Sequence, residues 1–144
     1  MKLRTFSIFP YIIAMVAITF WIYFARLIFG LGYGWETLAF VFFAPPFLLL
    51  QALAVVSLYR SHKLAPTIAP NTLQVRLFIS AMVTGFFLGL TSPYISDASP
   101  EMSILFREAS VATVYAIPLI LFTIYIGLLI AITVTSARVA RRSK

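Results

Sequence analysis

The 144-residue chain contains no cysteine, one histidine and only four acidic residues. The lack of cysteine excludes disulfides, thiolate metal sites and thiol catalysis. With His62 as its single histidine, the chain cannot assemble a bis-histidine haem site or a zinc site by itself. No acid, lysine or histidine falls near the middle of the long apolar runs, so nothing there could activate a serine or threonine. We therefore expect no enzyme, no metal site and no cofactor.

Charge of either sign is scarce and apolar residues are abundant. Apolar residues make up 62% of the chain and charged residues 10%, and the mean hydropathy is +1.01. A water-soluble domain of this size cannot bury that much apolar surface. Four intervals carry no charged residue, and these are 5–25, 37–59, 77–96 and 109–137. As a helix rising 1.5 Å per residue, each interval can cross a hydrocarbon core of about 30 Å.

The sequence therefore predicts an all-α integral membrane protein. Residues 1–144 are expected to form a single domain, a small bundle of four transmembrane helices. The predicted spans are residues 6–29, 36–58, 72–92 and 109–135.

Basic residues are distributed unequally between the two sides of these spans. Nine of the eleven lie on one side, namely Lys2, Arg4, Arg60, Lys63, Arg76, Arg138, Arg141, Arg142 and Lys144. The positive-inside rule then places both termini in the cytoplasm. We expect a multi-pass protein of the cell inner (plasma) membrane, with the mitochondrial inner membrane as the alternative. The net charge of +7 belongs to flanks of the spans, so we expect contact with lipid headgroups and not with nucleic acid.

Two of the predicted spans carry small residues at every fourth position. These are Ala81, Gly85 and Gly89 in the third span, and Thr123, Gly127, Ala131 and Thr135 in the fourth. Small residues at this spacing let two helices approach closely in lipid. The sequence predicts that the two ridges dock against each other as the packing seam of the bundle.

Polar and helix-bending residues mark four further candidate positions. Pro45 and Pro46 are predicted to bend the second span, and Gln51 follows little more than one turn later. This group is either a structural kink with an interhelical hydrogen bond or the polar part of a transport path. Arg26 is expected to extend its guanidinium to the membrane surface, and the alternative is that it pairs with Glu36 or Glu108 or reads an anionic substrate.

The outer loop, residues 92–110, contains two more candidate positions. Ser99, Pro100 and Glu101 resemble the start of a helix, which predicts a short interfacial helix near residues 100–108. Glu101 and Glu108 would share one face of that helix and could hold a cation, although solvated carboxylates need no ligand. On the inner side, Asn71 followed by Gln74 predicts a capped start for the third span.

Two functions fit this pattern. The first is a non-catalytic membrane protein that acts by helix-to-helix contact with another integral membrane protein or by self-association. An accessory subunit, an assembly factor, a regulator or a toxin-immunity protein would work in this way. The alternative is a small oligomeric transporter or channel subunit for a lipid-linked or anionic solute, with Pro45, Pro46 and Gln51 lining the path.

Overall fold

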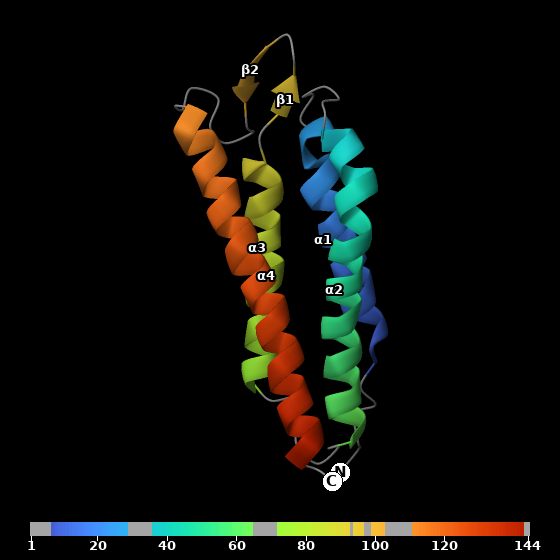
Figure 1. Cartoon of the computed structure of the whole chain (residues 1–144). Coiled ribbons are helices and arrows are strands. Elements are labelled where there is room, and N and C mark those ends of the chain that lie inside the picture. Colours follow the sequence, from blue (N-terminus) through green and yellow to red (C-terminus); the bar gives the residue numbers. More distant parts are fainter. Residues whose placement is uncertain are drawn as a thin grey trace.

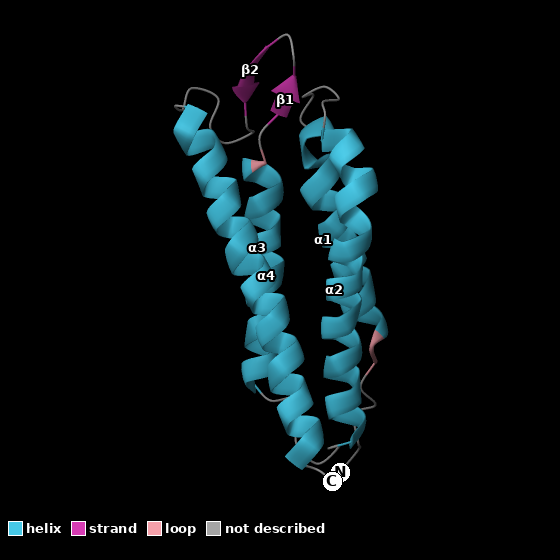
Figure 2. Cartoon of the chain, viewed as in Figure 1, coloured by secondary structure: helices cyan, strands magenta, loops and turns pink. Residues whose placement is uncertain are grey.

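The computed structural model describes residues 7–28, 36–64, 72–92, 94–96, 99–102 and 111–142. Within these residues the chain forms four helices and a two-stranded hairpin (Figure 1, Figure 2). The elements are α1 (Phe9–Ile28), α2 (Glu36–Leu64), α3 (Thr72–Thr91), β1 (Tyr94–Ser96), β2 (Ser99–Met102) and α4 (Val111–Arg142). The predicted all-α architecture is confirmed, apart from the short hairpin.

Each helix coincides with one of the four predicted spans, but two helices are longer than predicted. α2 continues to Leu64 and α4 to Arg142, whereas the predicted spans end at residues 58 and 135. The predicted ends marked where the apolar residues stop. A helix does not stop where its side chains become polar, and arginine and lysine are good helix formers.

Two helical stretches of the described residues are long and apolar enough to cross a membrane. They are Leu73–Thr91 in α3 and Ala112–Arg141 in α4, and a shorter apolar stretch, Phe9–Ala25, lies in α1. Only 33% and 22% of the two longer stretches is buried inside the fold. Most residues of these two stretches are therefore not enclosed by the rest of the fold.

The helices are arranged as a four-membered ring. α1 packs against α2 and α3, and α4 also packs against α2 and α3. Successive helices run in opposite directions, so the start of α1 and the end of α4 point to the same end of the bundle (Figure 1). The hairpin lies at the other end.

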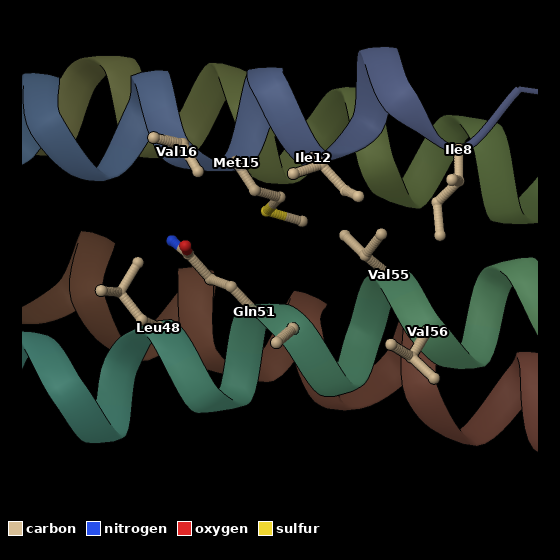
Figure 3. Close-up of a pocket in the computed structure, with 9 residues that line it drawn as sticks. Ile8, Ile12, Met15, Val16, Leu48, Gln51, Val55 and Val56 are labelled. Carbon is tan, nitrogen blue, oxygen red and sulfur yellow. The ribbon is translucent and has the colours of Figure 1, made fainter.

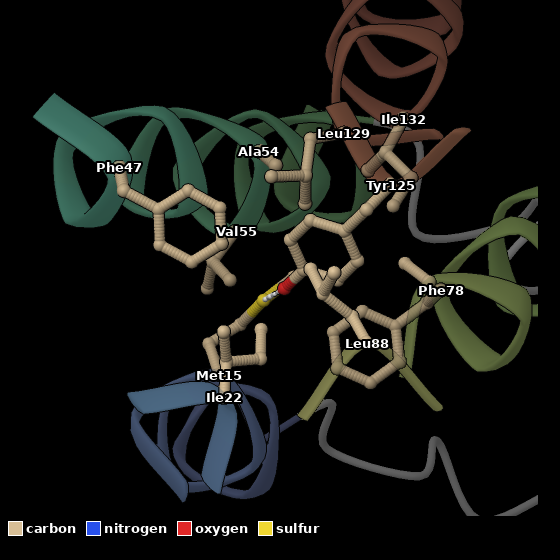
Figure 4. Packing of buried hydrophobic residues seen from close by; sticks show 11 residues of the cluster. Met15, Ile22, Phe47, Ala54, Val55, Phe78, Leu88, Tyr125, Leu129 and Ile132 are labelled. Atoms are coloured by element: carbon tan, nitrogen blue, oxygen red, sulfur yellow. Dashed lines mark hydrogen bonds between the residues drawn. The ribbon is translucent and has the colours of Figure 1, made fainter. Parts of the chain in front are cut away.

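The core consists of one inward stripe on each helix. Buried residues follow one another at spacings of three or four, as in Phe47, Gln51, Ala54, Leu58 and Ser61 of α2, Gln74, Phe78, Ala81, Gly85 and Leu88 of α3, and Tyr125, Leu129, Ile132 and Ser136 of α4. This spacing is typical of helices that pack at about 20° to one another. Figure 4 shows the apolar members of the stripes converging from all four helices.

The outward faces of the helices are apolar as well. Phe20, Leu49, Ile79 and Leu119, one from each helix, expose more than half of their surface. A helix that is apolar on every side is typical of a protein interior or a membrane.

The outer loop differs from the prediction. Pro100, Glu101 and Met102 belong to β2, which pairs antiparallel with β1 through Ser96 with Ser99 and Tyr94 with Met102. The predicted interfacial helix is therefore wrong over these three residues, and residues 103–108 lie outside the described part. Proline is compatible with the first positions of an edge strand as well as with a helix start, so the Ser-Pro-Glu signal did not distinguish the two.

The small residues of α3 form a site of close approach, mainly to α1 and at Gly85 also to Tyr125 of α4. A Cβ atom at Gly85 would lie 2.7 Å from Ile18 Cγ1 and 3.0 Å from Tyr125 Cε2. A Cβ atom at Gly89 would lie 2.6 Å from Trp21 Cδ1 and 3.1 Å from the Trp21 carbonyl oxygen. Ala81, one turn before Gly85, is fully buried.

The Trp21 side chain reinforces this approach. Its indole Nε1–H donates a hydrogen bond of 3.0 Å to the Phe86 carbonyl oxygen. The Trp21 and Phe86 rings also stack, with centroids 5.1 Å apart and planes 6° from parallel. The absence of a side chain at Gly89 is what leaves space for the indole between the two helices.

The small residues of α4 do not meet those of α3. A Cβ atom at Gly127 would have no neighbour within 4 Å, and Thr123 is exposed and donates its hydroxyl proton to Leu119 O in its own helix. Ala131 and Thr135 are half-buried. The predicted docking of the two ridges is therefore not what the structure shows, because α4 turns its Tyr125–Ser136 stripe toward α3 instead.

We predict that Gly89→Ala lowers the free energy of unfolding by about 1–3 kcal/mol, because the added methyl displaces the Trp21 ring. Gly127→Ala is the matched control, since its methyl enters open space. Alanine favours helix over glycine by up to about 1 kcal/mol, so this variant should be neutral or more stable. Thermal unfolding of both variants in mild detergent, followed by circular dichroism, tests the difference. Equal stability of the two variants would show that Gly89 is not at a close contact.

Candidate functional site

The centre of the bundle contains a buried polar cluster built around Gln51. Gln51 is 2% exposed, Thr19 3% and Tyr125 0%. Thr19 Oγ1 donates to Gln51 Oε1 at 2.6 Å, and Gln51 Nε2 donates to the Tyr125 hydroxyl oxygen at 2.9 Å. The Tyr125 hydroxyl in turn donates to Met15 Sδ at 3.9 Å (Figure 4). One carboxamide therefore joins α1, α2 and α4.

The helical spacing brings these side chains to one level. Met15 and Thr19 are four residues apart and so lie on one face of α1. Thr19 Oγ1 is also 2.9 Å from Met15 O, so its single proton has two acceptors within reach. The Tyr125 ring stacks on Phe47 of α2 with centroids 5.4 Å apart, which holds the hydroxyl at the height of Gln51.

The predicted kink at Pro45 and Pro46 does not interrupt the helix. α2 runs from Glu36 to Leu64 with both prolines inside it, and both prolines are exposed on its outer face. On the outer face their rings do not enter the core, and the next residue, Phe47, is buried. The structure therefore keeps Gln51 on a continuous helix.

A second buried polar cluster lies nearer the end of the bundle that carries the basic residues. Gln74 Nε2 of α3 donates to Ser136 Oγ of α4 at 3.0 Å and to Ser61 Oγ of α2 at 3.2 Å. Ser61 Oγ donates to Leu58 O at 2.8 Å. Gln74, Ser61 and Ser136 are each no more than 3% exposed. This buried cluster therefore joins α2, α3 and α4.

The sequence did not reveal this second cluster. Gln74 was interpreted as a local helix cap, whereas its amide nitrogen bonds to two other helices. The stripe spacing held the missing signal, because Ser136 lies seven residues after Leu129 and Gln74 seven residues before Ala81. Polar residues at such positions are expected inside the bundle and need partners there.

Two apolar cavities open beside α2. The first, here called the α1–α2 groove, has a volume of about 310 Å³. It is lined by Ile8, just before α1, by Ile12 and Val16 of α1, by Leu48, Ala52 and Val56 of α2, and at its floor by Met15, Gln51 and Val55 (Figure 3). The second, of about 430 Å³, is lined mainly by rings, those of Tyr23, Phe47 and Phe122, together with Pro46, Leu50 and Ile126. Of the side chains in the two polar clusters, Met15 and Gln51 line the first cavity, and none lines the second.

The remaining candidate positions are not brought together by the described structure. Arg26 and Glu36 lie within α1 and α2, and Glu101 lies in β2, but their side chains are outside the described part. Glu108 lies wholly outside it. In the described part of the chain, no three His, Asp or Glu side chains are gathered as metal ligands would be.

The chemistry of both clusters is that of neutral hydrogen bonding. Carboxamide and hydroxyl groups donate and accept protons in hydrogen bonds, but none of these side chains carries a charge. Each polar atom named above is already bonded to another helix or to its own backbone. The clusters are therefore suited to holding helices at a fixed register, as buried polar residues do in other helical assemblies.

Comparisons of the chain with protein-family models, with curated proteins and with solved structures gave no match.

We predict that Gln51→Leu destabilises the fold by about 1–2 kcal/mol, because both of its interhelical hydrogen bonds are lost. The loss stays moderate since Thr19 and Tyr125 keep acceptors on Met15. Adding Thr19→Val and Tyr125→Phe should recover part of the stability, because the Tyr125 oxygen, which has lost the Gln51 Nε2–H donor, is then no longer buried without it. Unfolding in mild detergent measures the free energies.

The couplings follow from a double-mutant cycle of Gln51→Leu with Tyr125→Phe. The two losses should be less than additive, since each change breaks the same bond. Fully additive losses would contradict the Gln51 to Tyr125 hydrogen bond.

Proposed function

We propose that the chain is an integral membrane protein that acts by lateral contact of its outer helix faces with another membrane protein. The observation that carries this proposal is that the polar side chains of the core bond to one another, while the outward faces of all four helices are apolar. The polar groups of the interior thus stabilise the fold. The outer surface is then the part of the protein that can bind a partner.

Helix lengths and exposed side chains support membrane insertion of all four helices. α1 and α3 each have 20 residues, which gives about 30 Å of helix, the thickness of a hydrocarbon core. Gln51 lies nine residues before Arg60, or about 14 Å along the axis, which is the separation expected if Arg60 lies at the membrane surface and the Gln51 cluster near the bilayer centre. Apolar surface as extensive as that of the outward faces is rare on soluble monomers.

The charge distribution supports one orientation. The ends of α2 and α4 and the start of α3, which point to one end of the bundle (Figure 1), carry Arg60, Lys63, Arg76, Arg138 and Arg141. Glu101 lies in the hairpin at the other end (Figure 1). By the positive-inside rule, the basic end would face the cytoplasm if the protein lies in the inner (plasma) membrane of a cell. It would face the matrix if the protein lies in the mitochondrial inner membrane.

Contact is favoured over transport by the state of Gln51. A transport path needs polar groups that can exchange partners with a solute, and such sites commonly lie at interrupted helices. Here both polar atoms of the Gln51 amide are engaged, and α2 is continuous through Pro45 and Pro46. The proposed partner is another integral membrane protein or a second copy of the chain. The protein would then serve as an accessory subunit, assembly factor, regulator or toxin-immunity protein.

We predict the membrane topology by cysteine labelling, for which the cysteine-free chain needs no prior substitution. A membrane-impermeant maleimide should label Ser99→Cys in the hairpin from outside intact cells. It should label Ser143→Cys only after the membrane is opened. The opposite pattern would reverse the orientation, and labelling of both positions in intact cells would contradict insertion.

We predict that replacing an exposed residue on one outer face with tryptophan prevents co-purification of the partner, while the protein stays folded. Ile13, Leu53, Val83 and Ile130 represent the four helices, and each is about half exposed. Tagged variants are purified from the native membrane in mild detergent, and the bound proteins are identified by mass spectrometry. Thermal unfolding verifies that each variant is folded.

Gly89→Ala is the control for general loss of stability, because it weakens the α1 to α3 contact without altering an outer face. It should retain the partner below its unfolding temperature. If none of the four tryptophan variants loses a partner, contact through these faces is wrong. A purified oligomer that moves a solute, and stops doing so in Gln51→Leu, would instead support the transporter.

A further inference from the structure

The α1–α2 groove is an elongated apolar slot that opens sideways. Ile12, Val16, Leu48 and Val56 line it and are 43%, 57%, 39% and 42% exposed. Figure 3 shows Leu48 and Val16 toward one end of the slot and Val56 and Ile8 toward the other. From Leu48 to Val56 the slot extends over eight residues of α2, which is about 12 Å.

The volume of the groove fits an alkyl chain better than a helix. One water molecule, which is similar in size to a methylene group, takes up roughly 30 Å³. The groove, at about 310 Å³, therefore has space for a chain of about ten methylenes. Two turns of helix, about 10 Å across and 11 Å long, would occupy roughly 800 Å³. The one amide on the floor, that of Gln51, is already bonded to Thr19 and Tyr125.

The face of α2 that lines the groove continues into two basic side chains. Leu48, Ala52, Val56 and Arg60 follow one another at every fourth residue, and Lys63 comes three residues later, so all five lie along one face. Arg60 and Lys63 are both exposed. They begin about 6 Å beyond the end of the groove, one helical turn after Val56.

No acidic residue in the described part of the chain lies near these cations. The four acids of the chain are Glu36, Asp97, Glu101 and Glu108. Glu36 starts α2 and Glu101 lies in the hairpin, both at the opposite end of the bundle (Figure 1). Among the described residues, the groove thus ends beside positive charge, which attracts anionic phosphate headgroups.

We infer that the α1–α2 groove binds one anionic phospholipid, with an acyl chain along the slot and its phosphate at Arg60 and Lys63. The two observations are independent, because the volume and lining select an alkyl chain and the two cations select the headgroup charge. The inference rests on the proposed membrane insertion but not on the proposed partner protein. It assigns Ala52 and Val56 to the chain and Arg60 and Lys63 to the phosphate.

The test uses the full chain in nanodiscs that contain equal amounts of phosphatidylglycerol and phosphatidylcholine with the same acyl chains. The protein is released from the disc, and the lipids that stay bound to it are identified by their masses in native mass spectrometry. The wild type should retain one phosphatidylglycerol in preference to phosphatidylcholine. Arg60→Gln or Lys63→Gln should reduce this preference roughly fivefold each. Arg76→Gln is the matched control, because α3 lies diagonally across the bundle from α2, and it should leave the preference unchanged.

A second pair of variants tests the slot itself. Ala52→Phe fills the groove and should abolish retention of the bound lipid regardless of its headgroup. Leu53→Phe adds the same ring to an exposed position outside the lining, and it should retain the lipid. An unchanged circular dichroism spectrum verifies that both variants are folded.

Three outcomes would overturn the inference. Bound lipid in the bulk ratio for the wild type would mean insertion without a site. Displacement of the lipid by millimolar inorganic phosphate would assign the cations to a free anion. A protein that does not enter nanodiscs at all would overturn the proposed membrane insertion as well. This outcome can be distinguished from the first two, because in both of those the protein is inserted in the disc.

Discussion

The hydrogen bonds of the Gln51 carboxamide are the interaction on which the rest of the bundle depends. The amide has an acceptor and a donor on one rigid group, and it uses them on different helices, Thr19 of α1 and Tyr125 of α4. Apolar stripes can slide past one another by a turn with little change in contact, but a buried amide without partners is costly. Only one axial register places these three side chains at the same height. The cluster therefore selects that register, whereas the surrounding Leu, Ile and Phe side chains fill space.

Each neighbouring pair of helices is held together by its own side-chain contacts. Thr19 with Gln51 joins α1 to α2, Gln51 with Tyr125 joins α2 to α4, and Gln74 with Ser136 joins α3 to α4. The α1 to α3 pair relies on close approach at Gly85 and Gly89 and on the Trp21 indole. Of the four pairs, α1 with α2 has the least extensive contact, and it is along this pair that the groove opens. The position of the groove thus follows from how unevenly the contacts are shared.

The sequence predicted the helices well and their partners poorly. Gaps between charges located all four helices because a long apolar interval has few other uses. The sequence predicts that Gln51 needs a hydrogen-bond partner. The spacing of residues along one helix, however, does not identify the residue of another helix that forms the bond. Gly85 and Gly89 likewise predicted a close neighbour, but the prediction named the small residues of the fourth span, whereas the neighbour at Gly89 is Trp21 of α1. Gln74 was missed because the Asn71 to Gln74 spacing suggested a sufficient local explanation, and the Ser99-Pro100-Glu101 signal suits an edge strand as well as a helix.

The internal use of polar groups limits how the protein could recognise anything in a bilayer. Apolar helix faces attract each other no more than they attract lipid tails, so selectivity between helices must come from shape or from charge. The outer surface offers both, in separate places. The open space at Gly127 and the slot between α1 and α2 are features of shape, while Arg60, Lys63 and the other cations at one end supply charge. The slot and two of these cations, Arg60 and Lys63, lie along one face of α2, where a single molecule with a tail and an anionic head can reach both.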